Sequence, residues 1–242
     1  YLSCMKTLCI IPVYNEDTKL NLLINQIKKY KTRNLNVDYL FINNGSTDKS
    51  HNIIKSSKFK FLSFKKNFGV GHALMVGFMH AKKHNYQSVI HLAGNGKMHP
   101  KYIKKFIKYL HVLNYDFVSG SRFLGGVADY KSNPTYRIVL IKIFYFFLRN
   151  LFNYDITDAT CGYRGFKINI FKNFKKFFFK KELFTYGYEY YSYGKVLKNS
   201  GIKKKEISVS MNYTSKTNYT KIRPIIDWYV MVKYWLIGYY EK

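Results

Sequence analysis

The feature that most constrains the fold is a regular alternation of two kinds of segment in the first half of the chain. Short apolar runs predict buried strands over residues 7–13, 37–42, 60–64, 88–92 and 116–121. Segments with apolar residues at helical spacing lie between them and predict helices over residues 18–30, 46–57, 69–84 and 100–113. We therefore expect a doubly wound α/β fold with a mostly parallel sheet and helices on both faces. In such folds ligands bind beyond the carboxyl ends of the strands.

Composition supplies a core for this fold and points to anionic partners. Of the 242 residues, 47% are hydrophobic. The 41 Lys and Arg residues exceed the 13 Asp and Glu residues by 28, so the chain attracts nucleic acid, anionic lipid headgroups or phosphorylated ligands. The three cysteines form no C-x-x-C pair and support neither a disulfide framework nor a zinc site. No recognition motif accompanies the charge, so we expect no nucleic-acid partner.

The second half of the chain carries features typical of a membrane surface. Residues 136–152 are apolar around most of a helix, with Lys142, Tyr145 and Arg149 on one narrow polar face. Such a helix is either buried in a large protein or lies in a membrane interface, and the positive charge favours the interface. Phenylalanines interleaved with lysines over 165–181 and an aromatic tail over 228–240 fit the same environment.

This pattern sets an expected location. No run reaches the ~20 apolar residues that a membrane-spanning helix needs. We expect C-terminal amphipathic helices at the interface, on the cytoplasmic side of a membrane. The chain would be held there peripherally or anchored by segments outside it.

One turn follows the strand predicted over residues 88–92 and is a candidate ligand site. It reads Ala93-Gly94-Asn95-Gly96-Lys97, and Pro100 after it suits the first turn of a helix. A turn that binds a metal and a diphosphate would be expected to carry carboxylates. This turn has none.

Four motifs lie at the ends of predicted strands or at the start of the third helix: residues 11–16 (IPVYNE), 43–48 (NNGSTD), 67–71 (NFGVG) and 92–100 (LAGNGKMHP). In order and spacing they resemble the inverting family-2 glycosyltransferases of GT-A fold, and more narrowly the dolichyl-phosphate mannose synthase-like, polyprenyl-phosphate branch. The resemblance covers nearly the whole chain. It implies a single GT-A catalytic domain over residues 1–242, with a nucleotide-sugar-binding half (1–122) and an acceptor-binding, membrane-facing half (123–242).

The resemblance implies inverting transfer of a sugar from a UDP- or GDP-linked donor to a polyprenyl (dolichyl- or undecaprenyl-type) phosphate. The family usually carries two aspartates where this chain has Asn43 and Asn44. An amide oxygen can still accept a hydrogen bond from uracil N3–H, but an amide also donates, so the base is not fixed. The donor-binding residues implied are Pro12, Tyr14, Glu16, Asn43, Asn44, Gly71, Ala93, Gly94 and Asn95.

The acids that hold Mg²⁺ or Mn²⁺ in the family fall on Ala93 and Asn95, and a family glutamine falls on Lys97. Alanine cannot ligate, and a neutral asparagine alone is a poor ligand for a hard cation. Either Lys97, aided by His99, neutralises the departing diphosphate without a metal, or the site binds its donor weakly and catalysis is impaired. We expect the first and therefore no metal, with Asn95 the only residue of the pair that could contribute a ligand.

On the acceptor side the resemblance implies Arg122, Arg137, Arg164 and Glu189. Guanidinium groups suit a lipid phosphate because they contact its oxygens in bidentate fashion. Asp158 is the candidate general base if the acceptor is a sugar hydroxyl, whereas a phosphate acceptor is already anionic and needs Asp158 only for positioning. The expected catalytic residues are Asp158, Lys97, Arg122 and Arg137.

Two other functions stay open. The chain could act on a saccharide acceptor in surface-glycan assembly. Because the metal-binding acids are missing, it could instead be a non-catalytic binder of a nucleotide sugar or a lipid phosphate.

Overall fold

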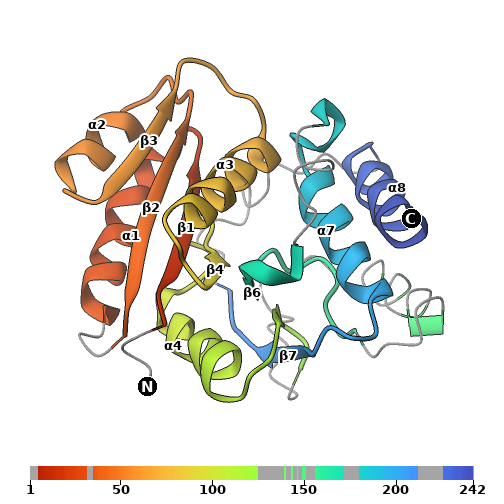
Figure 1. Cartoon of the computed structure of the whole chain (residues 1–242). Helices are drawn as coiled ribbons and strands as arrows, with labels where there is room; N and C mark the ends of the chain where they lie inside the picture. The colour runs from red at the N-terminus through yellow and green to blue at the C-terminus, as the bar shows by residue number, and fades with distance from the viewer. Residues whose placement is uncertain are drawn as a thin grey trace.

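A computed structural model describes residues 5–31, 35–124, 156–171, 180–211 and 226–241, together with residues 139, 143, 146, 149 and 150. The described residues form a seven-stranded sheet with the strand order β3-β2-β1-β4-β6-β5-β7 (Figure 1). The strands are β1 (Thr7–Val13), β2 (Val37–Asn44), β3 (Lys60–Phe64), β4 (Ser88–His91), β5 (Phe117–Ser121), β6 (Arg164–Lys167) and β7 (Lys204–Ser208). All five strands expected from the first half of the sequence are therefore confirmed.

The first four strands are parallel, and β5 pairs in parallel with β7. Strand β6 lies between β4 and β5 and is antiparallel to both. The sheet is therefore mostly parallel but mixed. Only four residues long, β6 gives no sequence signal as a strand, and its Gly165 has no side chain to separate the sheet from Phe106 and Leu110.

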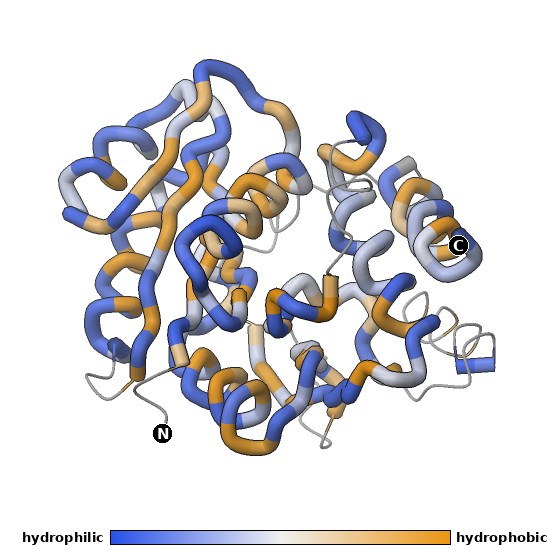
Figure 2. The backbone as a smooth tube through the Cα atoms, in the orientation of Figure 1, coloured by the Kyte–Doolittle hydropathy of each residue, from blue (hydrophilic) through white to orange (hydrophobic). Residues whose placement is uncertain are grey.

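Helices cover both faces of the sheet (Figure 1). One face is covered by α1 (Asp17–Tyr30), α2 (Ser50–Ser56) and α4 (Ile103–Ile107), and the other by α3 (Val70–Lys83) and α7 (Gly187–Lys198). Alternate residues of β1 enter these two cores, with Cys9, Ile11 and Val13 against α1 and α4, and Leu8 and Ile10 against α3. Figure 2 shows the hydrophobic residues concentrated on the central strands and the hydrophilic ones on outer turns.

The helix predicted over residues 100–113 is built from three consecutive pieces. A 3₁₀ turn at Pro100–Tyr102 leads into α4, and a π-helical turn follows at Lys108–Val112. The Nδ1 atom of His99 accepts a hydrogen bond from the backbone N–H of Lys101 at 3.1 Å and so caps the first turn. His99 therefore stabilises the start of this helix.

The last helix, α8 (Ile226–Tyr240), packs along α7 rather than standing apart from the domain (Figure 1). Trp235 is completely buried, and Tyr234 and Tyr239 pack against the same core. The prediction that the aromatic tail faces lipid headgroups is therefore wrong for Trp235. Aromatic side chains at helical spacing can also form a core. Tyr229 and Tyr240 remain exposed.

Gly194 of α7 and Gly238 of α8 allow a close crossing of the two helices. A Cβ atom at Gly194 would overlap the carbonyl oxygen of Trp235, and one at Gly238 would overlap that of Tyr191. Neither carbonyl can retreat without moving its helix. The crossing therefore requires glycine on both sides.

We expect Gly194→Ala to lower the free energy of unfolding by about 1–3 kcal/mol, because the added methyl group overpacks the crossing. Chemical denaturation followed by circular dichroism measures the change. Gly201→Ala is the matched control, since its Cβ would come within 3.4 Å only of the side-chain oxygen of Asn199. Equal losses for the two variants would contradict the expectation.

The amphipathic helix expected over residues 136–152 is described at five positions only. Residues 139, 143, 146, 149 and 150 are helical and exposed. Val139, Ile143 and Phe146 share one helix face and are 50%, 61% and 68% exposed. The predicted residues Arg137, Lys142 and Tyr145 lie outside the described residues, as do 172–179 of the Phe/Lys segment.

None of the helices in the described parts of the chain combines the length and the apolar character that crossing a bilayer requires.

Candidate active site

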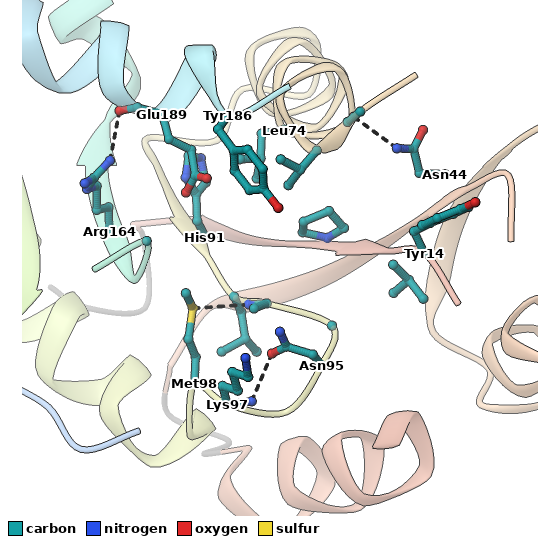
Figure 3. Close-up of a pocket in the computed structure, with 18 of the residues that line it drawn as sticks. Tyr14, Asn44, Leu74, His91, Asn95, Lys97, Met98, Arg164, Tyr186 and Glu189 are labelled. Carbon is teal, nitrogen blue, oxygen red and sulfur yellow. Dashed lines mark hydrogen bonds between the residues drawn. The ribbon is translucent and has the colours of Figure 1, made fainter. Parts of the chain in front are cut away.

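A cavity of about 460 Å³ opens at the carboxyl ends of β1, β2 and β4 (Figure 3). Its size is that of a small-molecule site. Residues from both halves of the chain line it. Of the predicted site residues, those that reach it are Pro12, Tyr14, Glu16, Asn44, Ala93, Gly94, Asn95, Lys97, Arg122, Arg164 and Glu189. Asn43, Gly71 and Asp158 do not line it, and Arg137 lies outside the described residues.

The segment after β1 is tied to the segment after β2 by hydrogen bonds. The backbone N–H of Glu16 donates to Ser50 Oγ at 2.9 Å, and that of Asp17 donates to Asp48 Oδ2 at 3.0 Å. Asn15 takes a positive φ of 51° within this segment. The predicted residue Glu16 lines the cavity and is held there by its backbone contact with Ser50.

The two asparagines at the end of β2 have different surroundings. Asn43 Nδ2 donates to Ser63 Oγ at 2.9 Å, and Asn43 Oδ1 accepts from the backbone N–H of Ser46 at 3.1 Å. Adjacent residues of a strand point to opposite faces, and of the two only Asn44 lines the cavity.

Asn44 lines the cavity and holds the loop before α3. Its Nδ2 atom donates to Asn67 Oδ1 at 2.8 Å and to the carbonyl oxygen of Gly69 at 3.0 Å, while its Oδ1 accepts from the N–H of Phe68 at 3.2 Å. An aspartate has no donor for the first two contacts. The amide therefore fits this loop where a carboxylate would be repelled.

Gly71 is a packing glycine. Its backbone N–H donates to the carbonyl oxygen of Thr185 at 3.0 Å. A Cβ atom at this position would overlap the backbone oxygens of Leu183 and Thr185. Gly71 therefore joins α3 to the segment before α7, and it does not line the cavity.

The turn after β4 is pressed against the end of β1. The backbone N–H of Gly94 donates to the carbonyl oxygen of Pro12 at 3.2 Å, and a Cβ atom at Gly94 would lie 2.6 Å from that oxygen. Gly96 takes a positive φ of 71°, which favours glycine. These contacts hold the turn against β1, with Asn95 and Lys97 on the cavity wall.

The donor atoms of this turn do not fit a magnesium or manganese ion. Ala93 has no side-chain ligand, and Asn95 Oδ1 already accepts the backbone N–H of Lys97 at 3.1 Å (Figure 3). The Lys97 side chain brings a positive charge to the same wall. Within the described residues, no three His, Cys, Asp or Glu side chains gather in a way that could hold a metal ion.

Arg122 and Asp158 form a buried ion pair. Arg122 Nε lies 2.6 Å from Asp158 Oδ2, Arg122 Nη2 lies 2.8 Å from Asp158 Oδ1, and both residues are at most 3% exposed. Burial alone would raise the pKa of Asp158, but the charge and hydrogen bonds of Arg122 outweigh it and hold the pKa below its usual range. A buried carboxylate with a lowered pKa is a poor proton acceptor. The geometry therefore does not support Asp158 as general base.

A carboxylate that no sequence motif indicated supports the loop beside this pair. Glu206 in β7 accepts hydrogen bonds from the backbone N–H of Thr157 at 2.8 Å and from its hydroxyl at 2.6 Å. It also accepts from the backbone N–H of Asp158 at 3.3 Å. Glu206 therefore fixes the loop that carries Asp158.

Arg164 and Glu189 are joined through the backbone. Arg164 Nη1 donates to the carbonyl oxygen of Glu189 at 2.8 Å (Figure 3), and Nη2 donates to that of Ala159 at 2.9 Å. The Glu189 carboxylate instead faces Gly162, where a Cβ atom would lie 2.8 Å from Oε1. Burial raises the pKa of Glu189, and the charge of Arg164 offsets this only in part.

The family model described as Glycosyl transferase family 2 matches residues 8–174 of the chain. The "Putative glycosyltransferase CsbB" of Bacillus subtilis (strain 168) is 32% identical over 163 residues, which cover 64% of this chain and 46% of that protein. The polyprenol monophosphomannose synthase of Mycolicibacterium smegmatis is 24% identical over 168 residues, which cover 67% of this chain and 62% of that enzyme. The matched region spans about half the length of the first of these relatives.

Two solved structures share the fold. Glucosyl-3-phosphoglycerate synthase from Mycobacterium tuberculosis, crystallised with Mn²⁺, UDP and phosphoglyceric acid, gives a TM-score of 0.65 at 13% identity, over 97% of this chain and 77% of that one. Residues 1–349 of S. aureus TarS give a TM-score of 0.59 at 15% identity, over 85% of this chain and 58% of that one. At such identities the likeness shows the fold alone, and it confirms the expected GT-A arrangement.

Proposed function

Because the chain belongs to glycosyl transferase family 2, we propose that it moves a sugar, with inversion, from a nucleoside-diphosphate sugar to a polyprenyl phosphate at a membrane surface. The observation that carries the proposal is that the turn bearing Lys97 and the predicted acceptor-binding residues Arg122 and Arg164 line one cavity. We assign residues 1–122 to donor binding and residues 123–242 to acceptor binding.

The donor end of the cavity suits a nucleoside diphosphate. Pro12, Tyr14 and Glu16 after β1 and Asn44 after β2 would surround the nucleoside. The diphosphate would follow along the turn that carries Lys97. A UDP- or GDP-linked sugar is the donor class that fits this order, and the relatives' structures with UDP are consistent with it.

Lys97 would supply the charge that the transfer requires. As the acceptor oxygen bonds to the anomeric carbon, the bond from that carbon to the diphosphate oxygen breaks, and its electron pair stays on the diphosphate. An ammonium group already in place at the cavity wall stabilises this developing negative charge. The chemistry otherwise consists of holding donor and acceptor in line.

The acceptor end favours an oxygen that is already anionic. Arg122 and Arg164 both line the cavity. Asp158, the candidate base, is fully buried against Arg122. A phosphate monoester needs no base, which agrees with this burial, and guanidinium groups bind phosphate well. One of the relatives is a polyprenol monophosphomannose synthase, and its name refers to a sugar joined to a polyprenol phosphate.

One observation favours a saccharide acceptor as the second candidate. Glu189 lines the cavity, and burial raises its pKa. A carboxylate of raised pKa is suited to accept the proton of a sugar hydroxyl. In that case Glu189 rather than Asp158 would be the base.

A turnover experiment separates the candidates. The purified chain is incubated with UDP-glucose, UDP-N-acetylglucosamine or GDP-mannose, each alone, with a polyprenyl phosphate or with saccharide acceptors, and both nucleotide binding and release of UDP or GDP are measured. Release that depends on the lipid phosphate supports the proposal. Nucleotide binding without release under any condition would favour the non-catalytic binder, and release with saccharides alone would favour the second candidate.

Membrane association is proposed from the exposed apolar residues Val139, Ile143 and Phe146 together with the +28 charge. Replacing all three by serine should weaken binding to vesicles containing anionic lipid at least tenfold, since each removes buried apolar area at the interface. Vesicle co-sedimentation measures this. Leu22→Ser is the control, because Leu22 on α1 is 54% exposed at a site distant in sequence. Unchanged binding of the triple variant would count against the proposed face.

A further inference from the structure

His91, the last residue of β4, is a buried polar side chain on the wall of the cavity. It is 4% exposed, and neither Nδ1 nor Nε2 has a hydrogen-bond partner among the described residues. Leaving buried polar atoms unpaired costs about 1–3 kcal/mol, so native structures rarely do it without a purpose. A ligand in the cavity is the natural partner for an imidazole in this position.

The surroundings of His91 keep its imidazole ring uncharged. Phe166 meets the ring edge-on at a centroid distance of 5.2 Å, and Tyr188 lies 6.1 Å away. Burial and, to a smaller extent, the positive charge of Arg164 together lower the pKa of His91 to about 3. The ring is therefore neutral at physiological pH. A neutral imidazole has one donor nitrogen and one acceptor nitrogen, and a hydroxyl group can pair with either of them because it both donates and accepts.

The position of His91 indicates which hydroxyl it meets. It precedes Ala93 by two residues on the strand that leads into the turn of Lys97, and Figure 3 draws it in the same part of the cavity as Glu189 and Tyr186. A sugar linked to a diphosphate at that turn would extend toward this part of the cavity. The base and ribose would lie at the other end, near Tyr14 and Asn44.

We propose that His91 is a specificity-determining residue, one of whose ring nitrogens hydrogen-bonds a hydroxyl group of the transferred sugar. The inference rests on the proposed function, since it needs a nucleotide sugar in this cavity. It does not require His91 to take part in proton transfer. It assigns His91 to the sugar and leaves the nucleotide to other residues.

Calorimetric binding of a nucleotide and of its sugar conjugate tests the inference. UDP is compared with UDP-glucose and UDP-N-acetylglucosamine, and GDP with GDP-mannose, in the wild-type chain, His91→Phe and His91→Gln. His91→Phe keeps an aromatic ring beside Phe166 but has no nitrogen, so the Kd for the sugar conjugate relative to that for the bare nucleotide should rise about tenfold. His91→Gln keeps a donor and an acceptor and should retain most of the wild-type ratio.

The outcomes are distinguishable. An unchanged ratio in His91→Phe overturns the inference while leaving the proposed function intact. Loss of nucleotide binding in both variants would mean that His91 is a packing residue, which also overturns it. If the wild-type chain binds none of the nucleotides or their sugars, the proposed function fails first, and the inference falls with it.

Discussion

Lys97→Ala should lower kcat/KM for sugar transfer by roughly 100- to 1,000-fold, the loss expected when one group that stabilises the leaving charge is removed. The reason is the composition of the turn after β4. Ala93 cannot ligate, Asn95 Oδ1 accepts the backbone N–H of Lys97, and the lysine side chain lines the cavity. Steady-state kinetics with the best donor of the turnover screen measure the effect. Lys101→Ala is the matched control, because Lys101 is an exposed lysine four residues away.

If Lys97 supplies the positive charge in place of a metal ion, chelation of divalent cations should leave wild-type activity unchanged. The relevant measurement is initial rate with and without EDTA, followed by addition of Mn²⁺. A large loss in EDTA that Mn²⁺ restores would contradict the role given to Lys97. A wild-type chain that turns over no donor in either condition would instead support the impaired-site hypothesis.

Asp158→Ala should lower the free energy of unfolding by about 3–5 kcal/mol, the cost of leaving one partner of a buried ion pair uncompensated. Arg122 would keep its charge at a site that is 3% exposed. Thermal or chemical denaturation measures the loss. The control is Lys6→Ala, which removes a half-exposed pair with Asp38 at 3.6 Å and should cost at most about 1 kcal/mol.

Replacing both partners tests the reason for this loss. Arg122→Met combined with Asp158→Leu removes both charges at once, so it should be less destabilising than Asp158→Ala alone. A double variant as unstable as the sum of the single variants would show that the residues act independently. Activity should fall in the double variant regardless, because Arg122 lines the cavity.

The pair also makes stability depend on pH in a defined direction. Because the pKa of Asp158 is lower in the folded chain, its contribution is fully present above the unfolded pKa of about 3.9 and disappears as the pH falls through the folded value. Wild type should therefore lose this stability only in strong acid. Asp158→Asn should show a weaker acid dependence, measured by denaturation at a series of pH values.

Much of the fold could be predicted because it depends on local periodicity. The apolar run of β1 and the helical spacing of Leu20, Leu23, Ile24 and Ile27 in α1 are visible in sequence and confirmed in the structure. Strand β6 could not be predicted, since four residues with a glycine carry no periodic signal and pair only through long-range contacts. The burial of Trp235 could not be predicted for a similar reason, because it depends on packing against α7.

The sequence motifs indicated which residues belong to the site, but not how these residues contact one another. The turn of Lys97 and the arginines Arg122 and Arg164 reach one cavity as the motifs suggest. The bond between Arg122 and Asp158 joins residues 36 positions apart, so no local pattern reveals it. His91 looks like a core residue because apolar neighbours surround it in sequence. Only the structure indicates a binding role, since neither ring nitrogen has a hydrogen-bond partner among the described residues.

The reversed direction of β6 has a topological consequence. Arg122 follows the end of β5, and Arg164 begins β6, so the antiparallel pairing brings both to the same edge of the sheet. The chain segment that joins them therefore begins and ends at that edge. Its length can change without shifting the register of either strand, because loop closure costs little per added residue. Insertions or deletions between the two arginines are therefore compatible with the pairing of β5 and β6.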